Sequence, residues 1–468
     1  MGTAQSTALL RHEQWQPNLV LCWLIGIGLL QIAAGIASIV YGWPLAVAPA
    51  ILVAFALALF FPRLGLLLLM AAMFSKQSLP GTDGIYASDV LSVPVVAGAL
   101  IRRFTMPSPA ELRNPLRAPM IAIAIYFGLT ILWAIHPLPA LVNWLRHLQL
   151  IVLGLLIAET VEIEDMPKIL GVMVAATFVI SVYTINEFAE GGGKQRVFGP
   201  AGWFFNTFLA MAMTHASVGA VLSDRRWARL CWMVCVTVCF LGLIATQTRS
   251  AMLQAVLGIL IAVVAVWMWA RWNKKPRIRR RIVTLVTVTS AMILIFLFGQ
   301  IMLFETSSGR VEEALEGRSN TIMIRLLLWK TGWTVFTDSP ILGVGLGQAS
   351  GWSEQFNYYH LDPASPRAGG LGVHNDAITY LAETGIVGTI LILWLFWVVS
   401  KMGWRLLTRM REQTEARQLL VLLAPAGAIM LHYFYSAYLF YSIGGMIVAY
   451  YFGMLTRLYT LHNRPSLT

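Results

Sequence analysis

The sequence predicts an all-α polytopic membrane protein with about 12 to 14 transmembrane helices and one large periplasmic loop late in the chain. Of its 468 residues, 58% are hydrophobic and only 12% are charged, whereas soluble domains carry about 25% charged residues. The chain also contains many continuously apolar stretches of about 17 to 25 residues, each long enough for a helix to cross a bilayer. Because these stretches do not alternate between polar and apolar residues, they argue against a membrane β-barrel.

Apolar runs and the breaks between them place the helices along the chain. The predicted spans are residues 18–41, 44–61, 64–75, 87–101, 118–135, 145–161, 168–188, 203–222, 228–245, 250–270, 282–304, 374–400, 418–434 and 438–457. The spans 64–75 and 87–101 are short for a crossing and leave room for re-entrant or fused segments. The predicted number of crossings therefore covers a range.

The basic residues predict which helix ends face the cytoplasm. The loop RWNKKPRIRRR at 271–281 holds seven of the 34 lysines and arginines, and short basic loops stay on the cytoplasmic side. Counting crossings from this loop places both termini inside as well. The same rule accounts for the net charge of +12, so we expect no nucleic-acid partner. No cleavable signal peptide is evident, because the polar start is followed by an apolar run that is too long for one.

One long polar segment, residues 305–373, falls on the external side. It divides the chain into N-terminal transmembrane helices at 1–304, a periplasmic loop domain at 305–373, and C-terminal transmembrane helices with a cytoplasmic tail at 374–468. Within the loop domain, RLLLWKTGWTVFTDSPILGVGLG at 325–347 looks helical. Its apolar positions favour a helix that lies on the membrane surface.

Three arginines belong to separate external connections. Arg249, in ATQTRSAML, falls at a tight turn between two apolar helices, where a charge is costly unless a partner or a water-filled cavity receives it. Arg325 lies in NTIMIRLLLWKTGW and Arg196 in GGGKQRVFGPAGWFFN. Simpler alternatives are a snorkelling side chain at Arg249 and headgroup contact at Arg325. Because a planar guanidinium binds pairs of phosphate oxygens, the three together predict an anion site at the outer face.

The glycine-rich stretch GVGLG at 343–347 is not a nucleotide loop. A dinucleotide fingerprint requires glycine at its sixth position, where this chain has Gln348. No lysine follows to form a phosphate-binding loop. Gly345 and Gly347 instead predict a compact turn in which backbone passes close to another group, which we interpret as part of a substrate-binding surface.

His374 is the best candidate for a general base. It stands at the beginning of a long predicted helix, whose positive dipole end disfavours the imidazolium form, and a neutral imidazole can accept a proton. The following Asn375 and Asp376 are suited to capping that helix. A lone histidine is more often structural, and the other external histidines have weaker contexts: His136, His147, His360 and His432. No motif of a serine hydrolase, zinc peptidase or paired-cysteine metal site occurs, so we expect no metal and no cofactor.

Three segments taken together resemble the O-antigen ligase and polymerase superfamily. They are TQTRSAML at 246–253, RLLLWKTGWTVFTDSPILGVGLG at 325–347 and VHNDAITYLAETGIVG at 373–388. The resemblance is strongest over residues 245–400 and agrees with the predicted topology. As a set these motifs are fairly specific, although each one alone is weak.

The resemblance implies a bacterial inner-membrane glycosyltransferase of the GT-C type that needs neither metal nor nucleotide. Such enzymes transfer a saccharide from an undecaprenyl-diphosphate carrier to an acceptor hydroxyl at the periplasmic face. The family's turn arginine falls on Arg249, its loop arginine on Arg325 with Trp329 after it, and its essential histidine on His374, which is paired with Asn375.

Two departures from the family pattern concern neighbouring positions. Thr248 stands where the family often has serine before the turn arginine. The usual Gly-x-x-x-Pro-Asn approach to the middle helix appears here as GPAGWFFNTFLA, which weakens the assignment of Arg196 and Asn206.

The resemblance leaves three activities open. Ligation of O-antigen to lipid A–core is the first expectation, and polymerisation of repeat units and transfer to protein are the alternatives. The implied partners are the lipid-linked donor, lipid A–core or another hydroxyl acceptor, and membrane lipids. A transporter of lipid-linked sugars is an alternative from a different class, but it predicts polar groups near the bilayer midplane and repeated halves, whereas the unusual charges here belong to one face.

Overall fold

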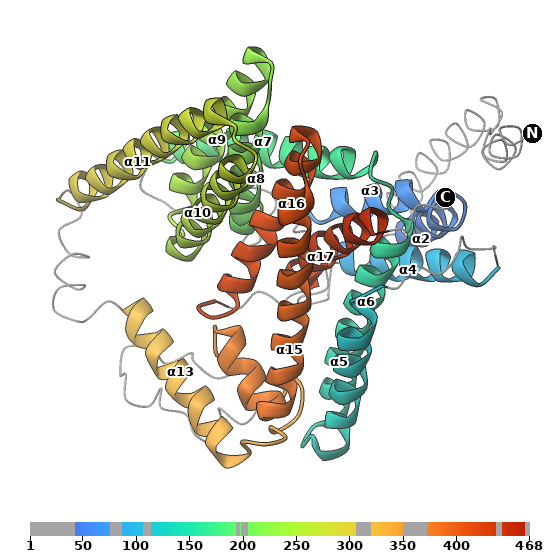
Figure 1. The fold of residues 1–468 in the computed structure, drawn as a ribbon. Helices are drawn as coiled ribbons and strands as arrows, with labels where there is room; N and C mark the ends of the chain where they lie inside the picture. Colours follow the sequence, from blue (N-terminus) through green and yellow to red (C-terminus); the bar gives the residue numbers. More distant parts are fainter. Residues whose placement is uncertain are drawn as a thin grey trace, which may run out of the picture. The chain divides into compact units, whose positions relative to one another are not determined.

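The computed structural model describes the greater part of the chain. The described residues are 43–74, 87–105, 114–192, 197, 205–305, 320–349, 372–436 and 442–463. They form helices and connecting turns without a β-strand (Figure 1). The predicted span 18–41 lies outside the described residues, whereas each of the other predicted spans overlaps a helix. The all-α class is therefore confirmed.

The helices follow one another along the chain with short connections. The first seven elements are α2 (Trp43–Phe60), α3 (Pro62–Ala72), α4 (Ala87–Thr105), α5 (Arg117–Leu129), the short 3-10 helix η2 (Thr130–Trp133), α6 (Pro137–Thr160) and α7 (Met166–Glu190). The next four are α8 (Phe205–Leu222), α9 (Arg226–Thr246), α10 (Arg249–Trp272) and α11 (Pro276–Glu305). The last four are α13 (Asn320–Asp338), α15 (Asp376–Arg409), α16 (Gln413–His432) and α17 (Ser442–His462).

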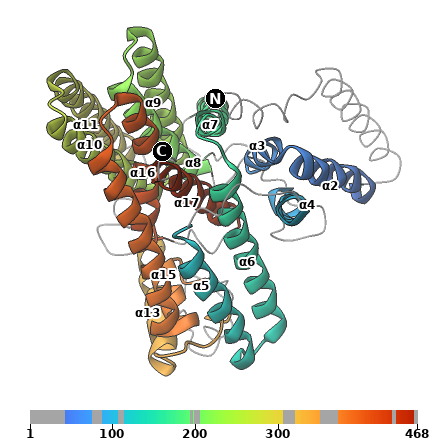
Figure 2. The same cartoon turned by 45° about the vertical axis from the view of Figure 1, so that its right-hand side comes forward.

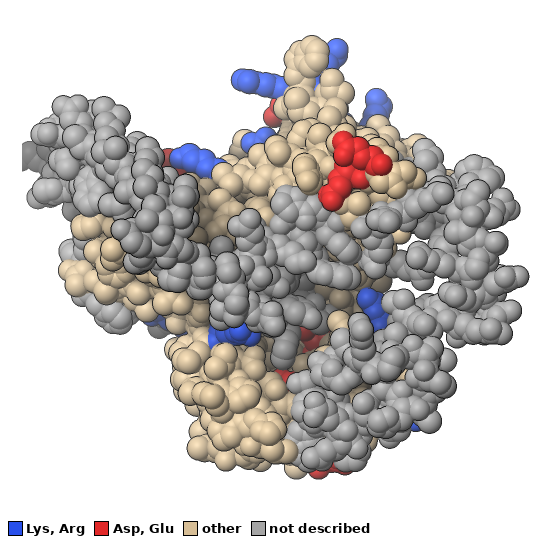
Figure 3. Space-filling model, turned by 180° about the vertical axis from the view of Figure 1, so that it is seen from behind, with Lys and Arg blue, Asp and Glu red and all other residues tan. Residues whose placement is uncertain are grey.

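Among the described residues, seven helices are long and apolar enough to cross a membrane: α6, α7, α8, α9, α10, α15 and α16. Three shorter apolar helical segments accompany them, at Ile51–Phe60, Pro62–Ala72 and Arg117–Trp133. Figure 3 shows a face on which most of the described surface carries neither acidic nor basic side chains. The composition of the helices thus makes this a multi-pass membrane protein.

The chain forms two compact units. The first comprises Met1–Leu69 and Ser78–Met106, and the second comprises Met70–Gln77 and Pro107–Thr468. Within the first unit α2 packs against α4, and the guanidinium of Arg102 donates hydrogen bonds to the carbonyls at the end of α2. All the candidate site residues belong to the second unit.

The second unit is built around α8, in which every residue is buried. Small residues bring the neighbouring helix α9 close, because Gly219 packs on the ring of Trp232 and Gly242 on Leu209. The first of these contacts joins late α8 to early α9, and the second joins early α8 to late α9. The two helices are therefore antiparallel, and α10, which begins after a tight turn, runs parallel to α8.

Helix α16 lies against α10 in the opposite direction. Gly258 of α10 faces Ala428 of α16, and at the other end the indole N–H of Trp269 donates to the carbonyl of Met410, just before α16. Consequently α16 ends near the beginning of α10. Figure 2 shows α8, α9, α10 and α16 gathered in this bundle.

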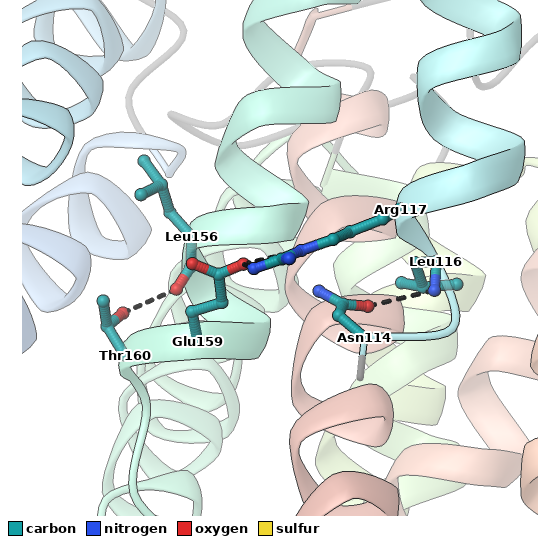
Figure 4. A network of polar contacts seen from close by, with 6 residues as sticks. All are labelled: Asn114, Leu116, Arg117, Leu156, Glu159 and Thr160. Atoms are coloured by element: carbon teal, nitrogen blue, oxygen red, sulfur yellow. Dashed lines mark hydrogen bonds and ion pairs between the residues drawn. The ribbon is translucent and has the colours of Figure 1, made fainter. Parts of the chain in front are cut away.

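A polar network joins α5 to α6 at the end of their hairpin (Figure 4). The guanidinium of Arg117 donates to Glu159 Oε1 at 2.8 Å from Nη2 and 3.3 Å from Nε. The side chain of Asn114 accepts the N–H of Leu116 in the turn that leads into α5. Arg457 of α17 donates to the carbonyl of Val161, directly after α6. These contacts fix α5, α6 and α17 together at one end.

Several helices, among them α6 and α15, differ in length from the predicted spans. Helix α6 begins at Pro137, before the predicted start at 145, because a proline is well suited to the first turn of a helix. Helix α15 continues past the predicted end at 400 to Arg409. That extension carries Lys401 and Arg405, so apolarity alone did not reveal it.

A break at Gly385 divides α15 into a short first part and a long second part. Gly385 has φ 63° and ψ −166°, a conformation that glycine adopts without steric cost. The turn 340–349 packs into the break: Ile386 N–H donates to the carbonyl of Pro340 at 2.9 Å, and Val344 N–H donates to that of Ala382 at 3.0 Å. The backbone groups released by the kink therefore find partners in this turn.

Candidate active site

His374 lies immediately before α15 in a constrained backbone conformation. Its φ of 54° is left-handed, which is uncommon for a residue other than glycine. Asn375 next to it caps the helix, since its Oδ1 accepts the N–H of Ile378 at 3.2 Å. The imidazole is partly buried, while Asn375 and Asp376 are buried. The helix cap thus fixes the point at which the imidazole leaves the backbone.

The turn after α16 holds the beginning of α15 in place. The N–H groups of Asp376 and Ala377 donate to the carbonyls of Ser436 and Tyr433, each at 3.1 Å. In addition, Asn375 Nδ2 donates to the carbonyl of Phe434 at 2.9 Å. Two of the free N–H groups at the start of α15 are satisfied in this way. The residues 433–436 therefore form one wall beside His374.

Helix α13 brings Arg325 to the same region. Gly332 of α13 packs against Val373 and Ile378, which stand on either side of the first residues of α15. Arg325 precedes Gly332 by seven residues, or about two helical turns, and so lies on the same helix face. The side chain of Arg325 is partly buried. Its charge acts on His374 and also on His432 at the end of α16.

The electrostatics of this pair favour a neutral imidazole. Burial, and next to it the positive charge of Arg325, lowers the pKa of His374 below its usual value of 6.5. The ring is therefore unprotonated at neutral pH and able to accept a proton. The positive end of the α15 dipole acts in the same direction.

Arg249 is the first residue of α10, and it lies at the end of the bundle where α16 ends with His432. Its side chain lies outside the described residues, but its backbone position follows from the packing of α10 on α16. The contact between Gly258 and Ala428 lies nine residues after Arg249 and four residues before His432. Because the helices are antiparallel, both ends reach the same side of the bundle, the side on which α13 and the first part of α15 lie (Figure 1).

Arg196 lies outside the described residues. Its neighbour Val197 donates its N–H to the carbonyl of Ala245 at 3.3 Å, near the end of α9. Ala245 precedes Arg249 by four residues. This contact brings the connection after α7 to the turn that carries Arg249.

Trp329 contributes to packing between α13 and α15. It joins Phe336 and Ile378 against a buried cluster that contains Val335, Val344, Ala349, Val373 and Ala382. Its indole N–H is buried and has no hydrogen-bond partner among the described residues. The packing orients α13, and the N–H is left available for a ligand; the binding role of Trp329 stays a prediction.

The backbone N–H groups of Gly345 and Gly347 are used inside the protein. Gly345 N–H donates to the carbonyl of Glu383 at 2.9 Å, and Gly347 N–H donates to the carboxylate of Glu383 at 2.8 Å. The close approach predicted for the glycine-rich turn is therefore made to α15. Their predicted contact with substrate stays a prediction.

Two side chains at this end of the bundle received little weight from the sequence: His432, whose context looked weaker than that of His374, and Tyr435. His432 packs edge-on against Tyr435, with ring centroids 4.9 Å apart, and burial raises the pKa of Tyr435. The local sequence LHYFYS offered a signal, because a histidine followed by three aromatic residues stands between two apolar helices there. Only the hydrogen bonds of residues 433–436 to α15 show that this turn adjoins His374.

No group of three or more His, Cys, Asp or Glu side chains within the described part of the chain is placed to hold a metal ion. The chemistry of the described site is that of a base and nearby cations. These side chains lie at one end of the helices of a multi-pass membrane protein.

Comparison with known families agrees with this class. Residues 233–393 match the family model described as O-antigen ligase, a range that includes Arg249, Arg325 and His374. The search of curated proteins gives no match. This match over about a third of the chain supports the O-antigen ligase superfamily and a glycosyltransferase function of the ligase or polymerase type.

Proposed function

We propose that this protein transfers a saccharide from undecaprenyl diphosphate to a hydroxyl acceptor at the periplasmic face of the bacterial inner membrane. The observation that carries the proposal is that helix α13, which bears Arg325, packs through Gly332 against Val373 and Ile378 on either side of the start of α15, where His374 stands. The side chains of His374 and Arg325 are both partly buried, and burial, followed by the charge of Arg325, lowers the pKa of His374. Ligation to lipid A–core is the form of the reaction that we put forward first.

In this mechanism His374 accepts the proton of the acceptor hydroxyl as its oxygen attacks the anomeric carbon. The bond between that carbon and the diphosphate oxygen breaks, so the electron pair leaves with the lipid diphosphate. Direct displacement of this kind inverts the anomeric centre. The proton stays on His374 until it passes to water or to the departing diphosphate.

Arg325 and Arg249 supply positive charge to the leaving group, together with Arg196. Negative charge grows on the diphosphate oxygen as the bond breaks, and fixed guanidinium groups stabilise it more in the transition state than in the ground state. Burial, together with the same guanidinium at 325, lowers the pKa of His374 and keeps it unprotonated before reaction. Arg325 thus has two roles: it stabilises the leaving diphosphate, and it helps to keep the base unprotonated.

Expression in a bacterial strain that lacks its own O-antigen ligase tests the proposal. Wild-type protein should restore the ladder of O-antigen on lipid A–core in a lipopolysaccharide gel, whereas His374→Ala should not restore it. His462→Ala is the matched control, because His462 lies in the last turn of α17 beside Glu415 and should leave the ladder intact. Equal amounts of each variant in the membrane fraction exclude a loss of folding.

Other outcomes assign the alternatives. Longer polymer on the carrier without a ladder on lipid A–core indicates a polymerase, and glycan on protein indicates a protein transferase. A normal ladder from His374→Ala would contradict the catalytic assignment. Movement of lipid-linked sugar across vesicles, with no product formed, would identify a transporter.

A further inference from the structure

Gln254 of α10 is a fully buried amide for which the fold provides no partner. Its side chain is 0% exposed, and neither its oxygen nor its nitrogen has a hydrogen-bond partner among the described residues. An unpaired buried amide costs free energy that native proteins seldom carry without a reason. A ligand that pairs with the amide is one such reason.

The position of Gln254 follows from helix packing. Gly258, four residues later on the same face, packs against Thr214 of α8 and Ala428 of α16. One turn nearer the start of α10, Gln254 lies at the level of His432, because α16 runs antiparallel. The turn that directly follows His432, residues 433–436, accepts hydrogen bonds from Asn375, Asp376 and Ala377 beside His374. Gln254 therefore borders the candidate active site.

A second amide lies on the α8 side of the same junction. Asn206 precedes Thr214 by two turns, which places it level with Ser250, the residue after Arg249. It is 5% exposed, and its Oδ1 accepts no hydrogen bond from any described residue. Both amides thus present an unused acceptor oxygen beside the start of α10.

The chemistry of these amides indicates what they bind. An ionised diphosphate offers acceptors only, which leaves the two amide oxygens unpaired. An isoprenoid chain offers neither donors nor acceptors. A sugar hydroxyl or acetamido group offers a donor to each oxygen and an acceptor to the Gln254 N–H group. The ligand that satisfies both amides is therefore a neutral, hydroxyl-rich group.

We propose that Gln254, with Asn206 beside it, binds the sugar that is attached directly to the lipid diphosphate. The proposal rests on the function proposed above. Arg249 stands about one and a half turns from Gln254, so a diphosphate at Arg249 brings its first sugar to the amides. Gln254 acts as a binding residue that distinguishes the sugar-bearing donor from the spent carrier.

Thermal unfolding of the purified full chain in detergent tests this inference. The probes are undecaprenyl diphosphate and undecaprenyl-diphosphate-linked N-acetylglucosamine. Wild-type protein should be stabilised more by the sugar-bearing lipid, because a ligand raises stability according to its affinity for the folded state. In Gln254→Met, which keeps the side-chain length, the extra stabilisation should disappear, with roughly tenfold weaker binding of the sugar-bearing lipid.

The ligand-free stability of the same variant separates binding from packing. Removing an unpaired buried amide should leave the unfolding temperature of Gln254→Met unchanged or higher. Ser217→Ala is the matched control, since Ser217 is also buried on α8 without a partner for its hydroxyl among the described residues, yet it lies beyond Thr214, away from Arg249. It should keep the full sugar-dependent shift.

Three results would overturn the inference. The first is a sugar-dependent shift that survives in Gln254→Met, and the second is a marked fall in its ligand-free unfolding temperature. The third is an effect confined to stabilisation by lipid A–core, which would assign the amides to the acceptor. Absence of any shift with undecaprenyl diphosphate in the wild type counts against the proposed donor itself, so the two failures are distinguishable.

Discussion

The carboxylate of Glu383 accepts a hydrogen bond of 2.8 Å from the backbone N–H of Gly347. Its second oxygen accepts the N–H of Ala349 at 3.2 Å, and the side chain is 1% exposed. One buried side chain of α15 thus holds the turn 343–349, which the glycine-rich sequence had marked for a close backbone approach. This contact connects the kink of α15 to the segment that follows α13.

Replacing Glu383 tests the importance of this contact. Glu383→Ala leaves two buried N–H groups without an acceptor, so we expect a loss of about 2–4 kcal/mol in the free energy of unfolding. Glu383→Gln should be milder, since its amide oxygen still accepts one of the two N–H groups. Unfolding in detergent measures both effects. Equal stability of Glu383→Ala and wild type would refute the structural role.

The kink at Gly385 gives a second prediction. A side chain at this position meets the backbone of Ile341 and is strained at φ 63°. Gly385→Ala should therefore destabilise the protein by roughly 2 kcal/mol or more and should reduce transfer, because the turn no longer seats against α15.

A glycine in an ordinary helix supplies the control for the kink. Gly171 lies within α7, and an added methyl group meets nothing within 4 Å. Gly171→Ala should raise stability by about 0.5–1 kcal/mol, since alanine favours the helical conformation. If the two substitutions had similar effects on unfolding, the special role of Gly385 would be ruled out.

The pH dependence of transfer provides a third prediction. The pKa of His374 is lowered, first by burial and then by the charge of Arg325, so its neutral form persists below pH 6.5. Transfer should fall only on further acidification, as the imidazole takes up a proton. In Arg325→Gln the acid limb of the pH profile should move to higher pH, because the repulsion of the imidazolium has been removed.

The residual transfer activity of an Arg325 variant is enough to measure the pH at which its acid limb lies. Arg325→Lys keeps a positive charge and should leave the acid limb close to its wild-type position, although the rate falls because lysine lacks the planar guanidinium. An acid limb that moves equally in both variants, or in neither, would show that the limb does not report His374 beside Arg325.

The sequence placed the helices well. Uninterrupted apolar runs marked α10 at 250–270, where the helix is Arg249–Trp272, and α16 at 418–434, where it is Gln413–His432. It also singled out His374 and Arg325, whose catalytic roles stay predictions; the structure adds that α13 packs against the residues that flank the start of α15. It gave no indication that Glu383 receives the glycine-rich turn, because a carboxylate within an apolar helix has no local partner.

Local composition therefore determined the membrane class and the approximate helical spans, since the bilayer requires long apolar helices whatever their neighbours. The tertiary structure decided which polar groups meet. The antiparallel packing of α16 on α10 sets Gln254 level with His432, and residues 433–436 pair with the first N–H groups of α15. Such contacts depend on segments that are far apart in the chain, and no periodicity within one segment encodes them.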